Sequence, residues 1–344
     1  MGTIVSYPEV CANAGCIRGK YESGRIKPYE AFYGIPFAEP PVGKLRLENP
    51  VPYSGWQGYW DATYPREDCL QKNYFLPNAP IKGSEDCLYL NVYRPSTWSR
   101  KKKLPVLVYI HGGAYLGFSG NPDQFGPEYL MDNGEVFLVT ITYRLGVFGF
   151  LSSGGDGVVK GNFGLKDQQL ALEWIFNNIE SFGGDSGAIT LSGQSVGAVS
   201  CNLHMLNSKS SAYFHRVILL SDTALTPHIR YTQDFATQYR MVAKIAGIVD
   251  WETASTSDLA YQLKRVDGLS LVSIDELFVF LFTPTVPLGP CIEGDWDGAF
   301  LTESPYVLWA EGRFSQKPIF AGHVKDEGAI RNQSMNLTTQ NLHR

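Results

Sequence analysis

Short runs of apolar residues recur along the chain without polar residues alternating between them. Runs of this kind are typical of strands that are covered on both faces of a sheet. The segment 164–179 separates the second run from the third, and its apolar residues are spaced as on one face of a helix. This order predicts an α/β fold with a mostly parallel central sheet and helices on both faces. The runs are 104–110, 136–143, 188–191, 217–220 and 318–322.

The stretch from 229 to 285 has a different pattern, rich in amphipathic helical segments. We expect it to be an insertion over one end of the sheet that borders a binding cleft. The chain has neither an internal repeat nor a low-complexity segment.

Charge and composition narrow the classes of partner. The formal net charge of −5 and the isoelectric point near 5.7 give no reason to expect a nucleic-acid ligand. No apolar run is long enough to span a bilayer, and the first residues lack the basic and apolar regions of a secretory signal peptide. Because the cysteines and histidines have no zinc spacing, neither a metal nor another cofactor is expected.

Two kinds of residue favour an oxidising, secretory environment. Cys69 and Cys87 flank a polar stretch that contains proline, which predicts a loop closed by a disulfide; the alternative is two unpaired thiols. Asn332 and Asn336 each begin a glycosylation sequon in a polar tail.

The most specific chemical motif surrounds Ser195. Gly193-Gln194-Ser195-Val196-Gly197 follows an apolar run and precedes a helical pattern, which is the context of a nucleophile elbow. A side chain at either glycine would collide with the neighbouring strand or helix, and the tight turn would lift the serine hydroxyl clear of the sheet. Because the five-residue pattern also occurs by chance, its interpretation depends on the rest of a site.

A serine hydroxyl attacks an ester only with a base, an orienting acid and donors for the oxyanion. His111-Gly112-Gly113-Ala114 follows the strand that ends at Ile110, and glycines there let two backbone N–H groups face one point. The backbone of Val196 would supply a third donor. The alternative is an ordinary glycine-rich turn after a strand.

The acid is expected after the serine in chain order. Glu327 fits, in the loop that follows 318–322, and its neighbour Asp326 is the competing carboxylate. The alternative is an exposed loop residue without a catalytic role. No histidine suits the base, because only His343 follows Glu327 at any distance and it lies in the polar tail. The histidines are His111, His204, His215, His228, His323 and His343.

Together these motifs resemble the type-B carboxylesterases, the cholinesterase-like group of the α/β-hydrolase fold. Gln194 in the elbow and the opening with Cys11 and Cys16 resemble insect juvenile hormone esterases in particular. The resemblance implies one domain over residues 8–344, incomplete at its C-terminal end, and secretion of the protein. The matching segments are 31–43, 84–91, 143–150 and 182–185.

The resemblance also implies roles for single residues. Ser195 would be the nucleophile, Glu327 the acid, and Gly112, Gly113 and Val196 the oxyanion donors, with Ser221 supporting the centre, Glu85 paired with Arg144, and Cys69 bonded to Cys87. The sequence departs from the family pattern at Val196, where alanine is usual, and at Asp222 and Thr223, where small residues are usual. The family histidine lies far beyond its acid, so we expect this chain to hold nucleophile, oxyanion hole and acid without the base.

The aromatic residues indicate the substrate class. The loop between Cys69 and Cys87 has no tryptophan for cation–π binding of a quaternary ammonium, so choline esters are not expected. Tyr115 and Phe118 beside the oxyanion loop favour an uncharged lipophilic ester, hydrolysed through an acyl-enzyme. The alternative is a non-catalytic adhesion or binding module of the same fold, which the absent histidine favours and the intact Ser195 opposes.

Overall fold

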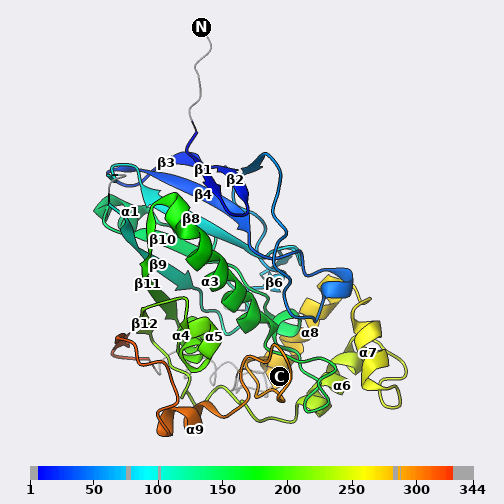
Figure 1. The fold of residues 1–344 in the computed structure, drawn as a ribbon. Coiled ribbons are helices and arrows are strands. Elements are labelled where there is room, and N and C mark those ends of the chain that lie inside the picture. The colour runs from blue at the N-terminus through cyan, green and yellow to red at the C-terminus, as the bar shows by residue number, and fades with distance from the viewer. Residues whose placement is uncertain (1–6, 75–78, 100–101, 282–285, 287, 328–344) are drawn as a thin grey trace.

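The computed structural model describes residues 7–74, 79–99, 102–281, 286 and 288–327 (Figure 1). The two sequons at Asn332 and Asn336, and His343, lie outside the described residues.

Each of the continuous apolar runs forms a strand of one eight-stranded sheet, as predicted. The order across the sheet is β13-β12-β11-β9-β10-β8-β4-β3. The pairings from β13 to β10 are parallel, and those of β8, β4 and β3 are antiparallel. The strands are β3 Lys20–Ser23, β4 Pro28–Pro36, β8 Tyr89–Pro95, β9 Leu104–Ile110, β10 Phe137–Ile141, β11 Gly184–Gln194, β12 Arg216–Leu220 and β13 Ile319–Gly322.

Helices cover both faces of this sheet. Neighbouring residues of a strand point to opposite faces, and on β4 they enter two separate apolar clusters. Phe32 packs edge-on against Phe182 of α3, with ring centroids 5.1 Å apart, whereas Ala31 and Tyr33 pack with Met131 of α1. The helices are α1 Glu128–Asn133, α2 Gly146–Phe150, α3 Phe163–Phe182, α4 Val196–Leu206, α5 Ser208–Ser211, α6 Phe235–Ile245, α7 Thr256–Leu263, α8 Gly268–Leu281 and α9 Pro305–Ala310.

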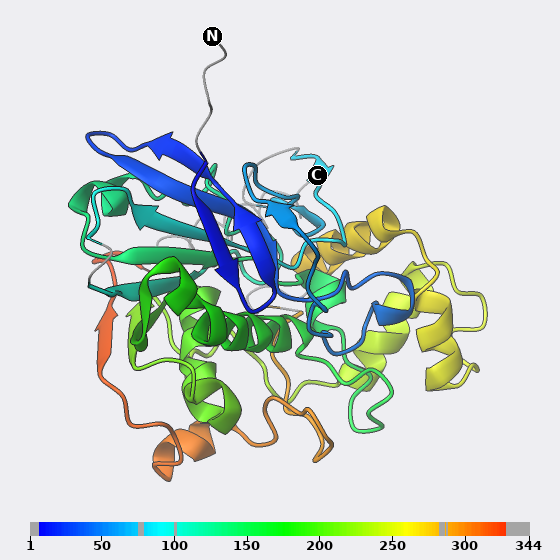
Figure 2. The same ribbon diagram turned by 45° about the horizontal axis from the view of Figure 1, so that its top comes forward.

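The stretch predicted to be an insertion forms α6, α7 and α8, which lie together at one end of the sheet (Figures 1 and 2). Helix α8 packs against the short helix α2. Helix α3 packs on strand β11, and helix α4 packs on β11 and β12 (Figure 1). The insertion lies beside the sheet, and its buried residues join the same apolar cluster as the sheet and its helices.

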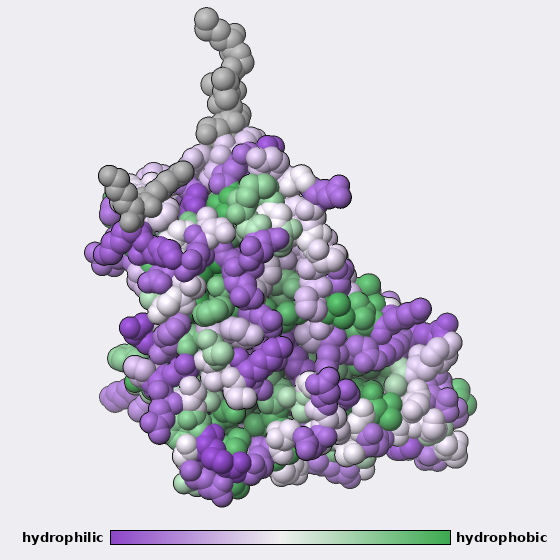
Figure 3. All heavy atoms as spheres, viewed as in Figure 1, coloured by the Kyte–Doolittle hydropathy of each residue, from purple (hydrophilic) through white to green (hydrophobic). Residues whose placement is uncertain are grey.

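Two small sheets complete the fold. Strands β1 Glu9–Ala12, β2 Gly15–Arg18 and β5 Tyr59–Asp61 form one, and β6 Gln71–Lys72 with β7 Ile81–Lys82 forms the other. Hydrophilic residues cover much of the face seen in Figure 3, with smaller apolar patches between them. Among the described residues, no helix combines the length and the apolar character that crossing a membrane requires.

Two disulfides form. Cys69 is bonded to Cys87, as predicted, and Cys11 is bonded to Cys16, which lies directly opposite it on the hairpin of β1 and β2. Cys201 and Cys291 are buried thiols. The sequence motif had indicated the first bridge, whereas the second pair had served only as a point of resemblance.

Removing the Cys69–Cys87 bridge by a double change to alanine is expected to destabilise the protein by about 3 kcal/mol, because the bridge closes a loop of 18 residues in the unfolded chain. Cys11–Cys16 closes only 5 residues, so its removal should cost less, about 2 kcal/mol. Urea unfolding of the two double variants measures both values. Equal losses, or no loss at Cys69–Cys87, would contradict the loop-closure argument.

Candidate active site

Ser195 occupies a sharp turn between a strand and a helix. Strand β11 ends at Gln194, α4 begins at Val196, and Ser195 between them has φ 55° and ψ −129°. A positive φ is strained for a residue other than glycine and persists only where its surroundings hold it. The Ser195 N–H donates to the carbonyl of Leu220 on β12 at 2.9 Å, and its carbonyl accepts from the N–H of Ala198 at 2.8 Å. The elbow predicted from the motif is therefore formed.

Both glycines of the elbow are sterically required. A Cβ atom on Gly193 would lie 2.4 Å from the carbonyl group of Gly197, and a Cβ atom on Gly197 would lie 2.2 Å from the carbonyl oxygen of Ile110. Real Cβ atoms do not approach backbone atoms this closely. The turn can be this tight because Gly193 and Gly197 have no side chains.

The glycine-rich loop lies directly beside the elbow. A Cβ atom on Gly112 would be 3.2 Å from Cβ of Ser195. Gly113 has φ 100°, and Ala114 and Tyr115 continue in the left-handed region. The hydroxyl of Tyr115 donates to the carbonyl of Val196 at 3.1 Å, which joins the loop to the start of α4. The first N–H groups of a helix have no intrahelical partner, and they carry the partial positive charge of the helix dipole. Because Tyr115 bonds the first residue of α4, this positive end lies next to the loop.

His111 is a structural residue of this loop. Its ring is buried and stacks on Tyr143 with ring centroids 4.3 Å apart, and Nδ1 lies 2.9 Å from the carbonyl oxygen of Gly112. Burial lowers the pKa of His111 to about 4. The ring is therefore neutral near pH 7 and donates from Nδ1 to that carbonyl.

Glu327 and Ser221 lie at the same edge of the sheet as Ser195. Ser221 follows β12 and donates its backbone N–H to the carbonyl of Gly322, the last residue of β13, at 2.8 Å. The hydroxyl of Ser221 and the N–H of Val324, 3.0 Å away, hydrogen-bond the Glu327 carboxylate and lower its pKa. Ser195, Ser221 and Glu327 thus follow the ends of three adjacent parallel strands, β11, β12 and β13.

The described histidines have other partners. His204 is buried between Ser210 and Gln168, at 2.9 and 3.0 Å, and burial lowers its pKa to about 3. His215 accepts from the N–H of Ile189, and His228 bonds Asp222. Within the part of the chain that the structure describes, no histidine hydrogen-bonds the Ser195 hydroxyl.

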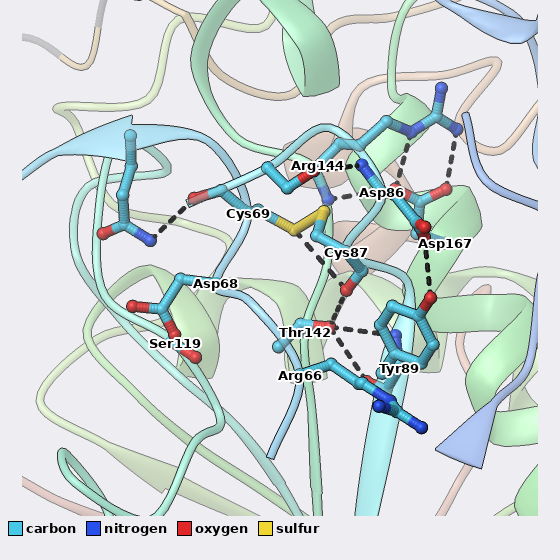
Figure 4. The surroundings of a disulfide bond; sticks show 12 residues. Arg66, Asp68, Cys69, Asp86, Cys87, Tyr89, Ser119, Thr142, Arg144 and Asp167 are labelled. Carbon is cyan, nitrogen blue, oxygen red and sulfur yellow. Dashed lines mark hydrogen bonds and ion pairs between the residues drawn. A yellow bond between two sulfur atoms is a disulfide. The ribbon is translucent and has the colours of Figure 1, made fainter. Parts of the chain in front are cut away.

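The expected pairing of Glu85 with Arg144 is wrong. Arg144 instead holds Asp167 with two parallel bonds, of 2.8 Å from Nε and 2.7 Å from Nη2, beside the Cys69–Cys87 bridge (Figure 4). Glu85 accepts from Nε of Arg46 at 2.7 Å. Asp167 is fully buried on α3, where a bidentate guanidinium is the partner that compensates its charge best. The sequence feature that could have indicated this partner is Asp167 itself, an acidic residue inside the helical segment 164–179.

Comparison with known proteins decides the family. The model of the carboxylesterase family matches residues 6–344. The chain belongs to the carboxylesterase family. The match covers the elbow, the glycine-rich loop and the loop of Glu327, and the fold is the α/β-hydrolase fold that the resemblance implied.

The chain is similar to several insect proteins. It is 40% identical over 333 residues to a juvenile hormone esterase of Tribolium castaneum, covering 95% of this chain and 56% of the relative. It is 38% identical to venom carboxylesterase-6 of Apis mellifera, covering 93% of this chain and 57% of that protein. The chain therefore spans little more than half the length of these relatives.

A solved structure agrees with the fold. The crystal structure of juvenile hormone esterase from Manduca sexta, with OTFP covalently attached, superposes with a TM-score of 0.82 at 32% identity. The superposition covers 91% of this chain and 59% of the Manduca chain.

Proposed function

We propose that Ser195 attacks the carbonyl carbon of a carboxylic ester and forms an acyl-enzyme. One observation carries the proposal: a serine held at φ 55° lies beside the Gly112–Gly113 loop, at the edge of the sheet where Glu327 follows β13, two strands from β11. A surface that only binds a partner needs none of this strain.

In this mechanism the tetrahedral intermediate places its negative charge among the backbone N–H groups of Gly112, Gly113 and Val196. The start of α4 adds the positive end of its dipole. Glu327 orients the imidazole that takes the serine proton, and Ser221 steadies Glu327. That imidazole has to come from outside the described residues, because each histidine within them has other contacts or no bond to Ser195.

An uncharged lipophilic ester is the proposed substrate class. Tyr115 is buried beside the elbow and Val196 is branched, so the side chains packed around Ser195 include large apolar groups, which supports an apolar substrate. The names of the Tribolium and Manduca relatives make juvenile hormone the first ester to test. The two disulfides support an oxidising compartment, in agreement with a secreted enzyme.

A fluorophosphonate probe tests the proposal directly. In a form of the protein that supplies the imidazole partner, we expect one phosphonyl group on the peptide that contains Ser195, found by intact mass and peptide mapping. The Ser195→Ala variant should stay unlabelled, and Ser208→Ala, at an exposed serine on α5, should label like the wild type. Labelling at another residue, or equal labelling of Ser195→Ala, would reject Ser195 as the nucleophile.

The second candidate function is a non-catalytic binding module. The lack of a histidine partner for Ser195 within the described residues favours it. A folded protein that includes the imidazole partner, yet neither reacts with the probe nor hydrolyses uncharged lipophilic esters, would support this alternative over the first.

A further inference from the structure

The glycine-rich loop beside Ser195 is strained beyond its glycines. Ala114, Tyr115 and Phe118 have φ 57°, 60° and 71°, a region that residues other than glycine enter only where their surroundings hold them. Within the loop, the carbonyl of Gly113 accepts from the N–H groups of Leu116 at 2.9 Å and Gly117 at 3.1 Å. These two bonds close the turn between 113 and 117, so Phe118 and the residues after it have to be held from outside the turn.

Gln71 holds the end of this turn. It lies on β6, two residues after Cys69 of the disulfide, and is only 1% exposed. Its Nε2 donates to the carbonyl of Phe118 at 2.8 Å and to the carbonyl of Cys69 at 3.0 Å. A side-chain amide has two N–H donors, and both are used here. One buried amide therefore joins the strained loop to the disulfide.

Asp68, on the other side of Cys69, holds the next residues of the loop. Its Oδ1 accepts from Nδ2 of Asn121 at 2.7 Å, and the hydroxyl of Ser119 also bonds its carboxylate. Asp68 and Ser119 both lie beside the disulfide in Figure 4. The ammonium group of Lys82 on β7 lies 2.7 Å from Oδ2 and compensates the charge. Hydrogen bonds to an ionised group are about twice as strong as those between neutral groups.

The segment that carries Asp68 and Gln71 is itself fixed. The N–H of Ser84 donates to the carbonyl of Asp68, and the N–H of Leu70 donates to the carbonyl of Ser84, both at 2.9 Å. The Cys69–Cys87 bridge ties the same segment to the residue before β8 by two. The glycine-rich loop is thus attached to a part of the molecule that cannot shift with it.

We propose that Asp68 and Gln71 are positioning residues for the oxyanion donors. By fixing residues 118–121 they keep the strained turn closed, and that turn determines where the N–H groups of Gly112 and Gly113 point. Neither side chain touches the ester. This inference rests on the proposed function, in which those N–H groups bind the negative charge of the intermediate.

Amide hydrogen exchange tests the attachment in this chain without an activity assay. Gln71→Met keeps a side chain of similar length and removes both donors. We expect exchange of the amides of residues 112–121 to become about 10-fold faster, because two buried hydrogen bonds no longer oppose local opening. Mass spectrometry of overlapping peptides measures it, and peptides of α3 should be unchanged.

Gln169→Met is the matched control. Nε2 of Gln169 on α3 also donates two hydrogen bonds, to Asn207 and Ser210, both at 2.8 Å. The variant therefore loses as many side-chain bonds as Gln71→Met, but none of them reaches the glycine-rich loop. Exchange at 112–121 should stay at the wild-type rate.

Steady-state kinetics separates positioning from a purely structural role. In a form of the protein that supplies the imidazole partner, hydrolysis of the uncharged ester p-nitrophenyl acetate by Gln71→Met should show kcat about 10-fold lower per folded molecule. KM should stay within about twofold, because misplaced oxyanion donors weaken the transition state rather than binding of the ester. A variant that was only less stable would keep the wild-type kcat per folded molecule.

Unchanged exchange at 112–121 in Gln71→Met would overturn this inference alone and leave the proposed function standing. Faster exchange with unchanged kcat would show that the loop is not the oxyanion hole, which rejects the oxyanion role in the proposed function and this inference with it. If Gln71→Met does not fold, Asp68→Asn decides by the same two measurements. It keeps the shape of the side chain but weakens the bonds to Ser119 and Asn121, so both changes are expected in the same direction.

Discussion

Replacing Gly197 by alanine is expected to abolish labelling of Ser195 and to destabilise the protein severely. The added Cβ atom would lie 2.2 Å from the carbonyl oxygen of Ile110 and 2.8 Å from that of His111, and both are backbone atoms of the strand and loop that flank the elbow. Neither can move aside like a flexible side chain. We expect the free energy of unfolding to fall by at least about 3 kcal/mol. Overpacking a close-packed core typically costs about 1–3 kcal/mol, and displacement of the backbone adds to that cost.

The effect on chemistry should exceed the effect on stability. Any folded Gly197→Ala protein has to shift α4 away from β9, and a displacement of about 1 Å near the reacting groups lowers rates by about 100-fold. Urea unfolding and the rate of fluorophosphonate labelling measure the two effects. Gly155→Ala is the matched control, because a Cβ atom on Gly155 would meet nothing within 4 Å. If Gly197→Ala were labelled at the wild-type rate, the elbow would not need a glycine at position 197.

Replacing Asp275 by asparagine is expected to remove a large pH dependence of stability. Asp275 lies on α8, is buried, and accepts one hydrogen bond, 3.2 Å from the N–H of Val147 at the start of α2. Burial raises its pKa from 3.8 to about 8. Between these two values the folded protein binds a proton that the unfolded chain has lost, so stability falls as pH rises through this window and levels off above about pH 8.

Each pKa unit of the shift at Asp275 changes the free energy of unfolding by about 1.4 kcal/mol. The total fall between the unfolded and folded pKa values is therefore on the order of 5 kcal/mol. We expect Asp275→Asn to lose the slope and to be more stable than the wild type at pH 8. Urea unfolding between pH 5 and pH 9 measures it. Asp267→Asn, at the exposed start of the same helix, keeps its cap on Ser270 and should leave the slope unchanged. Parallel curves for wild type and Asp275→Asn would show that this carboxyl is hydrated or paired.

The parts of the fold that were predictable are those set by local sequence. Continuous apolar runs located the parallel strands, and Gly193-Gln194-Ser195-Val196-Gly197 located the elbow, because a turn this tight permits few residue types. The antiparallel strands β4 and β8 were not predicted as strands. They lie in segments that had been interpreted only as family signatures.

Partners far apart in the sequence were harder to predict. Several acidic residues could have met Arg144, and only the packing of α3 against the loop after β10 selects Asp167. Asp222 had been noted as a departure from the family pattern, but its bond to His228 depends on how the loop after β12 closes. Asp275 belongs to an inserted helix whose position on α2 no local pattern specifies.

The left-handed conformations of Ser195 and Ser221 have a consequence for protein engineering. Each such residue stores roughly 1–3 kcal/mol, and glycine would release it. A search for heat-tolerant variants would thus favour Ser221→Gly early, yet that change deletes the hydroxyl that steadies Glu327. At position 221 the change that raises heat tolerance is therefore expected to lower the catalytic rate. A screen for heat-tolerant variants should measure both quantities.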